Sequence, residues 1–364
     1  MSQHPLRVGR PAARGSDQSQ GPGLRVESAL APSACRRAAG PPGGGKRAII
    51  RHFARTGEPL IPIKQCLLCG GDDVRLLHRS NVPARARAGS QYRCTSHALG
   101  IHPDIFRCRA CTFTFNEPAS GAVDHLSEYA QVDDPEYLEQ RESRRLTYGR
   151  ELDGLERLLR GRELLDVGCY TGFFLEQARE RGWVARGVEP SKWAADHAAT
   201  TLGLEVFHGP VEDYVATGVE RAFDLVTLWD VLEHLSDPVA VLRGVRSLLR
   251  PDGLLAFTTH NLDSVLARLM RGRYPFFMEM HTVHLNDRTI DLLLETTGFE
   301  LVERHVHRRA VRLEYLLSRF RRLGELPARA MQRLAQAAGL ADRVVWIGFV
   351  GLETIVARPS GRGT

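Results

Sequence analysis

The stretch "LLDVGCYTGFF", residues 164–174, joins an apolar run, an acidic residue and two glycines. The run from Glu163 to Val167 is typical of a buried parallel strand. Beyond the loop, apolar residues recur at roughly helical spacing, at Phe173, Phe174, Ala178 and Trp183. A strand, a glycine-containing loop and a helix in this order are the context of a nucleotide-binding turn.

The spacing of the glycines restricts the class of ligand that this loop can bind. A dinucleotide loop needs G-x-G-x-x-G, whose second glycine lets the backbone approach the pyrophosphate. Here Tyr170 occupies that position, between Gly168 and Gly172, and no Gly-Lys-Ser/Thr follows as a P-loop requires. S-adenosylmethionine, an adenosine with an amino-acid tail and no phosphate, therefore fits better. A turn whose glycines serve only local packing is the structural alternative.

Later strands also end in acidic residues. The predicted strand Val184–Val188 precedes Glu189, about 20 residues past the first glycine, where a carboxylate can reach ribose hydroxyls. The predicted strand Phe223–Trp229 precedes Asp230, and Leu254–Thr258 forms a further strand after a Pro-Asp-Gly turn. Ligands of open α/β sheets bind beyond the carboxyl ends of strands, so these acids should gather at one edge.

Four segments together resemble the class I S-adenosylmethionine-dependent methyltransferases: "LLDVGCYTGFFL", "GVEPSKWAADHA", "FDLVTLWDVLEHLSDP" and "LLRPDGLLAFTTHN". The resemblance implies a Rossmann-like, seven-stranded α/β sheet. It places Asp166, Gly168 and Gly172 at the methionine end of the cofactor, Glu189 at the ribose and Asp230 near the sulfur. Cys169 and Tyr170 belong to the same loop. Pro210 stands where the family often has an adenine-binding Asp, which leaves this role to the Val211 backbone or to Glu212.

Two Cys-x-x-Cys pairs, Cys66/Cys69 and Cys108/Cys111, are separated by 38 residues. Four thiolates in two such knuckles satisfy a structural zinc ion. Chance pairs in a reducing compartment and a redox pair are the alternatives. Cys94, His97 and His102 lie between the pairs and could replace one ligand or have no role; Cys35 and Cys169 are expected to bind no metal.

The cysteine segment followed by the catalytic segment resembles a bacterial methyltransferase subgroup with an N-terminal zinc-ribbon-like segment. This resemblance implies a small-molecule acceptor, such as a sugar, a sugar nucleotide or a polysaccharide or natural-product intermediate, methylated on oxygen or carbon. The predicted organisation is a basic Gly/Pro-rich disordered tail (1–55), a zinc-ribbon-like domain (60–120), a helical linker (121–160), the methyltransferase domain (161–358) and a short tail (359–364).

Charge argues against a nucleic-acid partner. The formal net charge is +6, and residues 1–50 hold eight basic and two acidic residues, so the rest of the chain is balanced. That tail is either a weak electrostatic tether, a solvated extension or an overlong gene model. An RNA methyltransferase that uses the ribbon to bind RNA remains an alternative, supported by "RARAGSQYR" at 85–93, but it would need a larger basic face. An NAD-dependent sugar-modifying enzyme and a non-catalytic relative of the fold are further alternatives.

The sequence predicts no membrane span and, with seven cysteines and no secretory signal, a reducing cytoplasmic location. The segment 311–337 is predicted as amphipathic helices that break near Pro327. Its position between the last two strands fits a lid, a helix of a homodimer or packing against the sheet.

Methyl transfer to a hydroxyl, amine or acidic carbon needs a base beside the acceptor. The candidates near the strand ends are His281, His284, His234 and Glu233, of which His281 is the first choice because it aligns with a histidine of the resembling group. A structural role is the alternative for each. The spacing Asp230-x-x-Glu233-His234 also resembles the metal-binding acids of ubiquinone-pathway O-methyltransferases. His305 and His307 are expected to be structural.

Overall fold

The computed structural model describes residues 65–83, 93–95, 98–116, 125–319 and 325–361. The predictions for the tail at 1–55, for His97, for most of the "RARAGSQYR" segment and for the end of the chain after residue 361 lie outside these residues. Residues 52–364 form one unit by their internal contacts.

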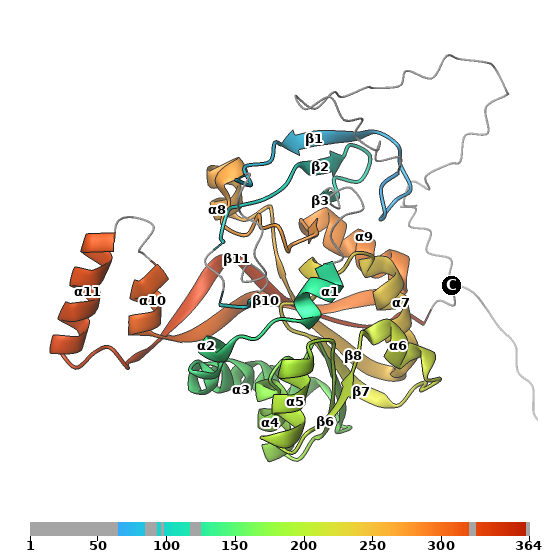
Figure 1. The fold of residues 1–364 in the computed structure, drawn as a ribbon. Helices are drawn as coiled ribbons and strands as arrows, with labels where there is room; N and C mark the ends of the chain where they lie inside the picture. The colour runs from blue at the N-terminus through green and yellow to red at the C-terminus, as the bar shows by residue number, and fades with distance from the viewer. Residues whose placement is uncertain (1–64, 84–92, 96–97, 117–124, 320–324, 362–364) are drawn as a thin grey trace, which may run out of the picture. The chain divides into compact units, whose positions relative to one another are not determined.

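A seven-stranded mixed sheet forms the centre of this unit, as the sequence predicts (Figure 1). Its spatial order is β10-β11-β8-β7-β4-β5-β6. The strands are β4 (Glu163–Val167), β5 (Val184–Glu189), β6 (Glu205–His208), β7 (Phe223–Leu228), β8 (Leu249–His260), β10 (Phe299–Arg312) and β11 (Val344–Pro359). β4 to β8 are parallel, whereas β11 runs antiparallel to both β8 and β10. β8 is longer than expected, because it already starts at Leu249 and contains the predicted Pro-Asp-Gly turn.

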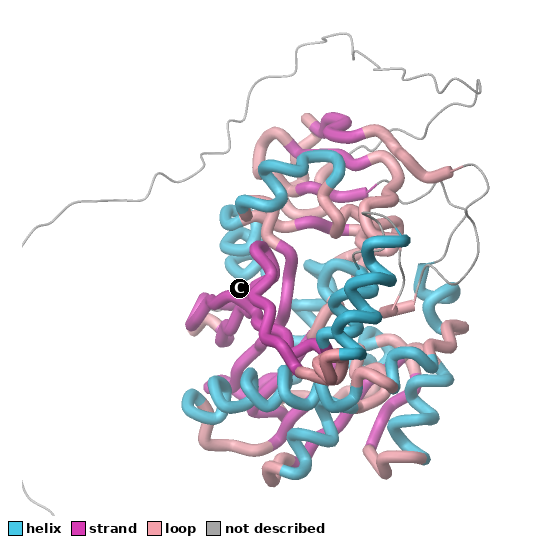
Figure 2. Tube along the Cα trace, turned by 90° about the vertical axis from the view of Figure 1, so that its left-hand side faces the viewer, coloured by secondary structure: helices cyan, strands magenta, loops and turns pink. Residues whose placement is uncertain are grey.

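Helices cover both faces of the sheet (Figure 2). Those on one face are α3 (Arg141–Leu158), α4 (Phe173–Glu180) and α5 (Lys192–Thr200). Those on the other are α6 (Val211–Ala216), α7 (Pro238–Leu248) and α9 (Asp287–Thr297). Side chains of β4 pack on both faces of the sheet. Leu164 packs into one apolar core, and Leu165 and Val167 pack into the other. This period of two explains why the strand reads as a continuous apolar run.

The predicted linker contributes to the catalytic body. It contains α1 (His125–Ala130), α2 (Pro135–Leu138) and α3. α3 buries Leu152 and Leu155 against the sheet and contacts α4 and β10. We therefore assign this helical segment to the layer of helices that packs on the central sheet, and not to a linker between domains.

The cysteine segment forms a second sheet in the order β1-β2-β3-β9. Its strands are β1 (Val74–His78), β2 (Ile105–Cys108), β3 (Thr114–Asn116) and β9 (Val283–His284). β9 lies about 170 residues after β3 in the chain, between β8 and β10 of the central sheet. It pairs antiparallel with β3. The boundary predicted near residue 120 therefore does not separate two independent sheets.

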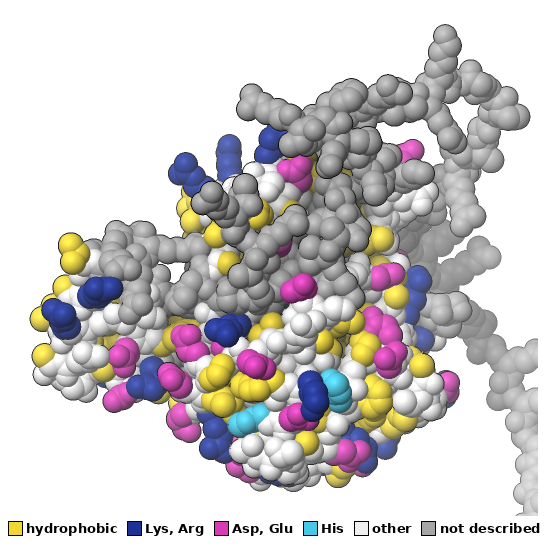
Figure 3. Space-filling view, viewed as in Figure 1, with side chains coloured by type: hydrophobic (Ala, Val, Ile, Leu, Met, Phe, Trp, Pro, Cys, Tyr) yellow, Lys and Arg dark blue, Asp and Glu magenta, His cyan; other side chains and the backbone are white. Residues whose placement is uncertain are grey.

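The segment between β10 and β11 projects from the sheet as a helical arm (Figure 1). It holds α10 (Leu313–Arg319) and α11 (Glu325–Ala337), which contact each other. The described helices end at Arg319 and begin at Glu325, which agrees with the predicted break near Pro327; Pro327 lies in the first turn of α11, where the missing N–H is tolerated. Leu326 and Leu334 of α11 are 81% and 71% exposed, and Figure 3 shows hydrophobic and basic side chains on this arm.

The remaining short elements are the helices α8 (Val265–Met270), η2 (Leu232–His234) and η3 (Arg271–Arg273). In the described residues, no helix is both long enough and apolar enough to pass through a bilayer.

Candidate functional site

The loop after β4 is shaped by close backbone packing. Gly168 has φ = +69°, and its N–H donates to the Val188 carbonyl at 2.8 Å. A Cβ at this position would lie 2.5 Å from Cγ2 of Val231. Gly168 is therefore needed for two reasons, the left-handed backbone and the contact with the segment after β7.

A cavity of about 330 Å³ lies beyond the carboxyl ends of β4, β5, β7 and β8. One part of its wall is the glycine loop, and another is formed by η2, by the end of β8 and by the segment before β9. The predicted cofactor residues that line it are Asp166, Gly168, Cys169, Tyr170, Val211, Glu212 and Asp230. The edge predicted from the strand ends is thus where the cavity lies.

Gly172 and Glu189, also predicted to contact the cofactor, are not among the lining residues. Gly172 is the N-cap of α4, and a Cβ there would lie 2.5 Å from Leu204. Glycine at this position therefore allows close packing against Leu204. Local packing is the structural alternative that the sequence left open for the glycines of this turn. The buried Glu189 carboxylate accepts hydrogen bonds from the N–H groups of Tyr170 and Ser191, at 2.8 and 2.7 Å, and so holds the loop against the start of α5.

Asp230 lies between two arginines that the sequence did not indicate. Arg309 of β10 donates to both of its carboxylate oxygens, and Arg144 of α3 lies 3.8 Å from one of them. Burial opposes ionisation of Asp230, but the two guanidinium groups hold its pKa well below the ordinary value. Arg144 also covers the ring of Tyr137 at 4.5 Å. All four side chains line the cavity.

A cluster of imidazole and carboxylate groups also lines the cavity. Glu233, His234 and His281 place one potential ligand atom each within 4.8 Å of one another. The metal-binding hypothesis based on sequence spacing combined Asp230 with Glu233 and His234. In the structure the third residue near Glu233 and His234 is His281, and Asp230 forms an ion pair with Arg309.

Two hydrogen bonds orient the histidines of this cluster. Nδ1 of His281 lies 2.8 Å from the Phe276 carbonyl, and Nδ1 of His234 lies 2.9 Å from the Met280 carbonyl. Because a carbonyl only accepts, both Nδ1 atoms carry the proton, and the lone pair of each neutral ring is on Nε2. Burial, followed by the neighbouring His234 and His260, lowers the pKa of His281 well below the ordinary value.

Glu233 and His260 form a buried pair in the same wall. His260, at the end of β8, places Nε2 3.7 Å from Glu233 and stacks on Phe276 with ring centroids 3.8 Å apart. Burial, and then the charge of Asp230, raises the pKa of Glu233 to about 8. Burial lowers the pKa of His260 to about 3. Burial thus disfavours the charged form of both groups.

His284, the second candidate base, is not among the residues that line the cavity. It lies on β9, where its Nε2 is 3.0 Å from the Asn116 side-chain oxygen. His305 and His307 contact the buried Glu151, which agrees with the structural role expected for them.

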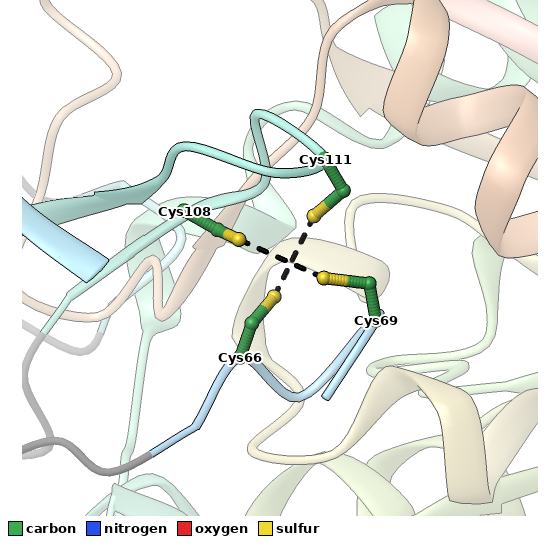
Figure 4. A group of neighbouring side chains, drawn as sticks. All are labelled: Cys66, Cys69, Cys108 and Cys111. Atoms are coloured by element: carbon green, nitrogen blue, oxygen red, sulfur yellow. Dashed lines mark hydrogen bonds between the residues drawn. The ribbon is translucent and has the colours of Figure 1, made fainter. Parts of the chain in front are cut away.

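The four predicted zinc ligands point toward a common centre (Figure 4). All four sulfur atoms lie within 4.8 Å of one another, with Cys66 to Cys111 and Cys69 to Cys108 both at 3.6 Å. Sulfurs of a tetrahedral zinc site with Zn–S bonds of about 2.3 Å would be about 3.8 Å apart. Burial raises the pKa of the Cys66 thiol to about 11, so a cation would have to favour its thiolate.

Of the residues considered as replacement ligands, Cys94 and His102 are described, and both have other surroundings. Cys94 lines the large cavity. His102 has Nδ1 2.7 Å from the Pro103 carbonyl and Nε2 3.1 Å from the Gly272 carbonyl. The geometry therefore favours the four cysteines as one complete set.

Residues 137–304 match a family model described as a methyltransferase domain. A relative named ubiquinone biosynthesis O-methyltransferase, from Actinobacillus pleuropneumoniae, is 35% identical over 110 residues, which are 28% of this chain and 47% of the relative. The protein of the same name from Coxiella burnetii is 26% identical over 172 residues, 44% of this chain and 74% of the relative. The chain thus spans about half the length of the first of these relatives.

A solved structure, titled a SAM dependent methyltransferase from Archaeoglobus fulgidus, is similar with a TM-score of 0.42 and 18% identity. The likeness covers 62% of this chain and 100% of that chain. The match over residues 137–304 agrees with the glycine loop, the strand-end acids and the cavity built from them. Residues 137–304 are therefore similar to a methyltransferase domain, and relatives named ubiquinone biosynthesis O-methyltransferase are similar to part of this chain.

Proposed function

We propose that this protein transfers the methyl group of S-adenosylmethionine to a hydroxyl of a small organic acceptor. The observation that carries the proposal is the cavity itself. Its lining includes both the glycine loop and the cluster of Glu233, His234, His260 and His281. A donor site and a proton-accepting site in one cavity are what methyl transfer to a hydroxyl requires.

The donor end offers a place for each part of the cofactor. The loop from Asp166 to Tyr170 would hold the methionine portion, and Val211 and Glu212, at the start of α6, would border the adenine. Arg144 would pair with the cofactor's α-carboxylate, because it lies over the ring of Tyr137, which contacts the ring of Tyr170 in the loop with centroids 4.5 Å apart. Bound in this way, S-adenosylmethionine supplies an electrophilic methyl group.

The acceptor end supplies a base. Nε2 of His281 carries the lone pair and belongs to a wall residue, so it can take the hydroxyl proton as the oxygen attacks the methyl carbon. Burial lowers the pKa of His281, which favours the neutral ring that a base requires but also weakens its basicity.

Apolar and aromatic side chains form much of the acceptor wall: Trp229, Phe276, Met278 and Met280. We infer a planar, largely apolar acceptor that bears a hydroxyl, in preference to the sugar expected from the sequence. The relatives' name, which refers to O-methylation in ubiquinone biosynthesis, agrees with a small-molecule O-methylation. Nothing in the comparisons supports the sugar, RNA or NAD-dependent alternatives.

A labelled-methyl transfer screen tests the proposal. Catechols and other phenols, sugar nucleotides and bulk tRNA would be incubated with labelled S-adenosylmethionine, and calorimetry would measure binding of the cofactor and of NAD. We expect cofactor binding and label in the phenols. Label in tRNA that falls steeply with rising salt, or binding of NAD instead of S-adenosylmethionine, would contradict the proposal.

We also propose that Cys66, Cys69, Cys108 and Cys111 hold one structural zinc ion. The support is the closeness of four sulfurs contributed by two knuckles, each followed by a short strand of the same small sheet. Such a closed set of thiolates leaves no position for substrate, which assigns the ion to folding rather than to catalysis.

A further inference from the structure

The segment that carries His281 lies between the cysteine sheet and the catalytic sheet. It leaves η3, passes Phe276 and His281, forms β9 and then enters α9. On one side, the Thr282 N–H and hydroxyl donate to the Glu233 carbonyl at 2.7 and 3.2 Å. On the other side it meets β3 of the cysteine sheet. The position of His281 therefore depends on both sheets.

Asn116, the last residue of β3, makes most of the contacts on the cysteine side. Its side-chain N–H₂ donates to the carbonyls of Met278 and His281, at 3.0 and 2.5 Å. Its backbone N–H donates to the Thr282 carbonyl at 2.9 Å. Its side-chain oxygen lies 3.0 Å from Nε2 of His284, which must donate this bond. One buried amide thus uses both N–H donors and its oxygen on this segment.

These contacts fix the backbone on both sides of the base. Met278 and His281 are held by the Asn116 amide, while the His281 ring is held by the Phe276 carbonyl. Loss of the amide would leave two buried carbonyls without this donor and would free the backbone that carries the His281 ring. A displacement of about 1 Å at a reacting group can reduce the rate by about 10²-fold.

We propose that Asn116 is a positioning residue for His281, so that the four-cysteine module forms part of the acceptor site. The inference rests on the proposed function, since it assumes that His281 faces the acceptor. It explains why a strand pair joins the cysteine module to the segment before α9, a contact that a ribbon folded by itself would not need.

The test compares Asn116→Ala and Asn116→Ser with Asn81→Ala. Asn81 is a matched control: it lies in the same module and its side chain also bonds two backbone groups, the Gly100 carbonyl and the His102 N–H, but neither group belongs to the segment that carries His281. Turnover, KM for the acceptor and affinity for the cofactor product S-adenosylhomocysteine would be measured for each. We expect Asn116→Ala to lower kcat by about 10²-fold, Asn116→Ser to lower it less, and all three to bind the product within about twofold of the parent.

A second readout does not depend on turnover. Imidazole ¹⁵N spectra, with the His281 signals assigned by their loss in His281→Gln, report whether Nδ1 carries the proton. We expect the Nδ1–H form in the parent and in Asn81→Ala, and mixed or shifted signals in Asn116→Ala. The groups that face this ring are His234, His260 and Glu233, so the pH profile would be recorded for all variants.

The outcomes separate the two proposals. Unchanged kcat and an unchanged His281 spectrum in Asn116→Ala would overturn the positioning role. A fall in product affinity as large as the fall in kcat would also overturn it, because it would indicate general loss of structure. If the parent protein methylates no acceptor, the proposed function fails, while the spectra still decide whether Asn116 fixes the His281 ring.

Discussion

At the scale of single residues, His281 and His284 show that two residues of the same type can have different roles. His281 and His284 are three positions apart, both are buried, and burial lowers the pKa of each. Only His281 lines the cavity, whereas His284 donates to Asn116 inside the small sheet. The two residues differ in their local backbone: His281 ends a turn in which its N–H donates to the Met278 carbonyl, whereas His284 lies on β9.

His281→Ala should retain cofactor binding and lose turnover, because the base is removed but the donor end of the cavity is not touched. The expected loss in kcat is about 10²–10⁴-fold, typical of a general base. Steady-state kinetics with the best acceptor, together with calorimetry for the cofactor, would measure both effects. His208→Gln, an exposed histidine at the end of β6, is the control. Parent-like turnover in His281→Ala would assign His281 to structure and direct attention to His234.

Gly168→Ala should weaken cofactor binding, because the new Cβ would meet Val231 and the left-handed backbone would be strained. Val231→Ala removes the atom that clashes. A double-mutant cycle of cofactor affinity should therefore show a favourable coupling, with the double variant binding more tightly than Gly168→Ala alone. Additive effects would mean that the backbone angle, and not Val231, determines the need for glycine.

At the scale of elements, a buried polar network joins α3 to the β10–β11 pair. The carboxylate of Glu151 lies 3.1 Å from His305 and from the Thr354 hydroxyl, and 3.3 Å from His307. Burial opposes ionisation of Glu151, but the hydrogen bonds from the two histidines prevail and lower its pKa to about 2. The same contact raises the pKa of His305. The network fixes the helix that carries Arg144 relative to the strand that carries Arg309.

Glu151→Gln should destabilise the fold most between about pH 4.5 and 6.5. The lowered pKa of Glu151 gives stability that is present above its ordinary value and is lost as pH falls toward 2. The raised pKa of His305 gives stability that is present below about 6.5 and is lost as pH rises through its folded value. Melting temperatures of parent and variant from pH 3 to 9 would measure the difference, which should narrow at both ends.

Glu303→Gln is the matched control for this network. Glu303 contacts the same His305 at 3.1 Å, but its side chain is 47% exposed. Exposed ion pairs contribute little, so its melting temperature should stay near the parent's at every pH. A Glu151→Gln effect that does not vary with pH would show that the network acts through packing and not through charge.

At the scale of the whole described unit, the cysteine module and the catalytic sheet share a structural boundary. β9 completes the small sheet, and Arg288 of α9 donates to the Ala110 carbonyl between the two knuckle cysteines at 3.0 Å. Disorder in the cysteine module should therefore affect the segment that carries His281 more than the glycine loop. The glycine loop is held by its contacts with β5 and with the segment after β7.

Metal analysis of untagged protein should give close to one zinc per chain. Removal of zinc by a chelator should increase amide exchange in β1 to β3 and β9 and lower turnover, with cofactor affinity largely kept. Cys69→Ser, which removes the exposed member of the set, should show the same pattern. Metal-free protein with parent-like exchange in the small sheet would contradict the zinc assignment.

The sequence by itself determined the parallel strands of the central sheet and the edge at which the cavity lies. Apolar runs that end in Asp166, Glu189 and Asp230 predict parallel strands, because a strand buried on both faces needs no polar alternation. The order of such strands then places their carboxyl ends on one edge, where the cavity lies. The cysteine pairs likewise predicted four thiols in one place, because each knuckle is a local turn.

Only the tertiary structure decided which distant residues meet. Arg309 reaches Asp230 across 79 positions, and Asn116 reaches His281 across 165, spacings at which no local period exists. It also separated Gly168, which borders the cavity, from Gly172, which packs against α5, although both occupy the same loop. The physical reason is that strands and turns follow from short-range periodicity, whereas charge pairs and close contacts follow from how the finished elements pack.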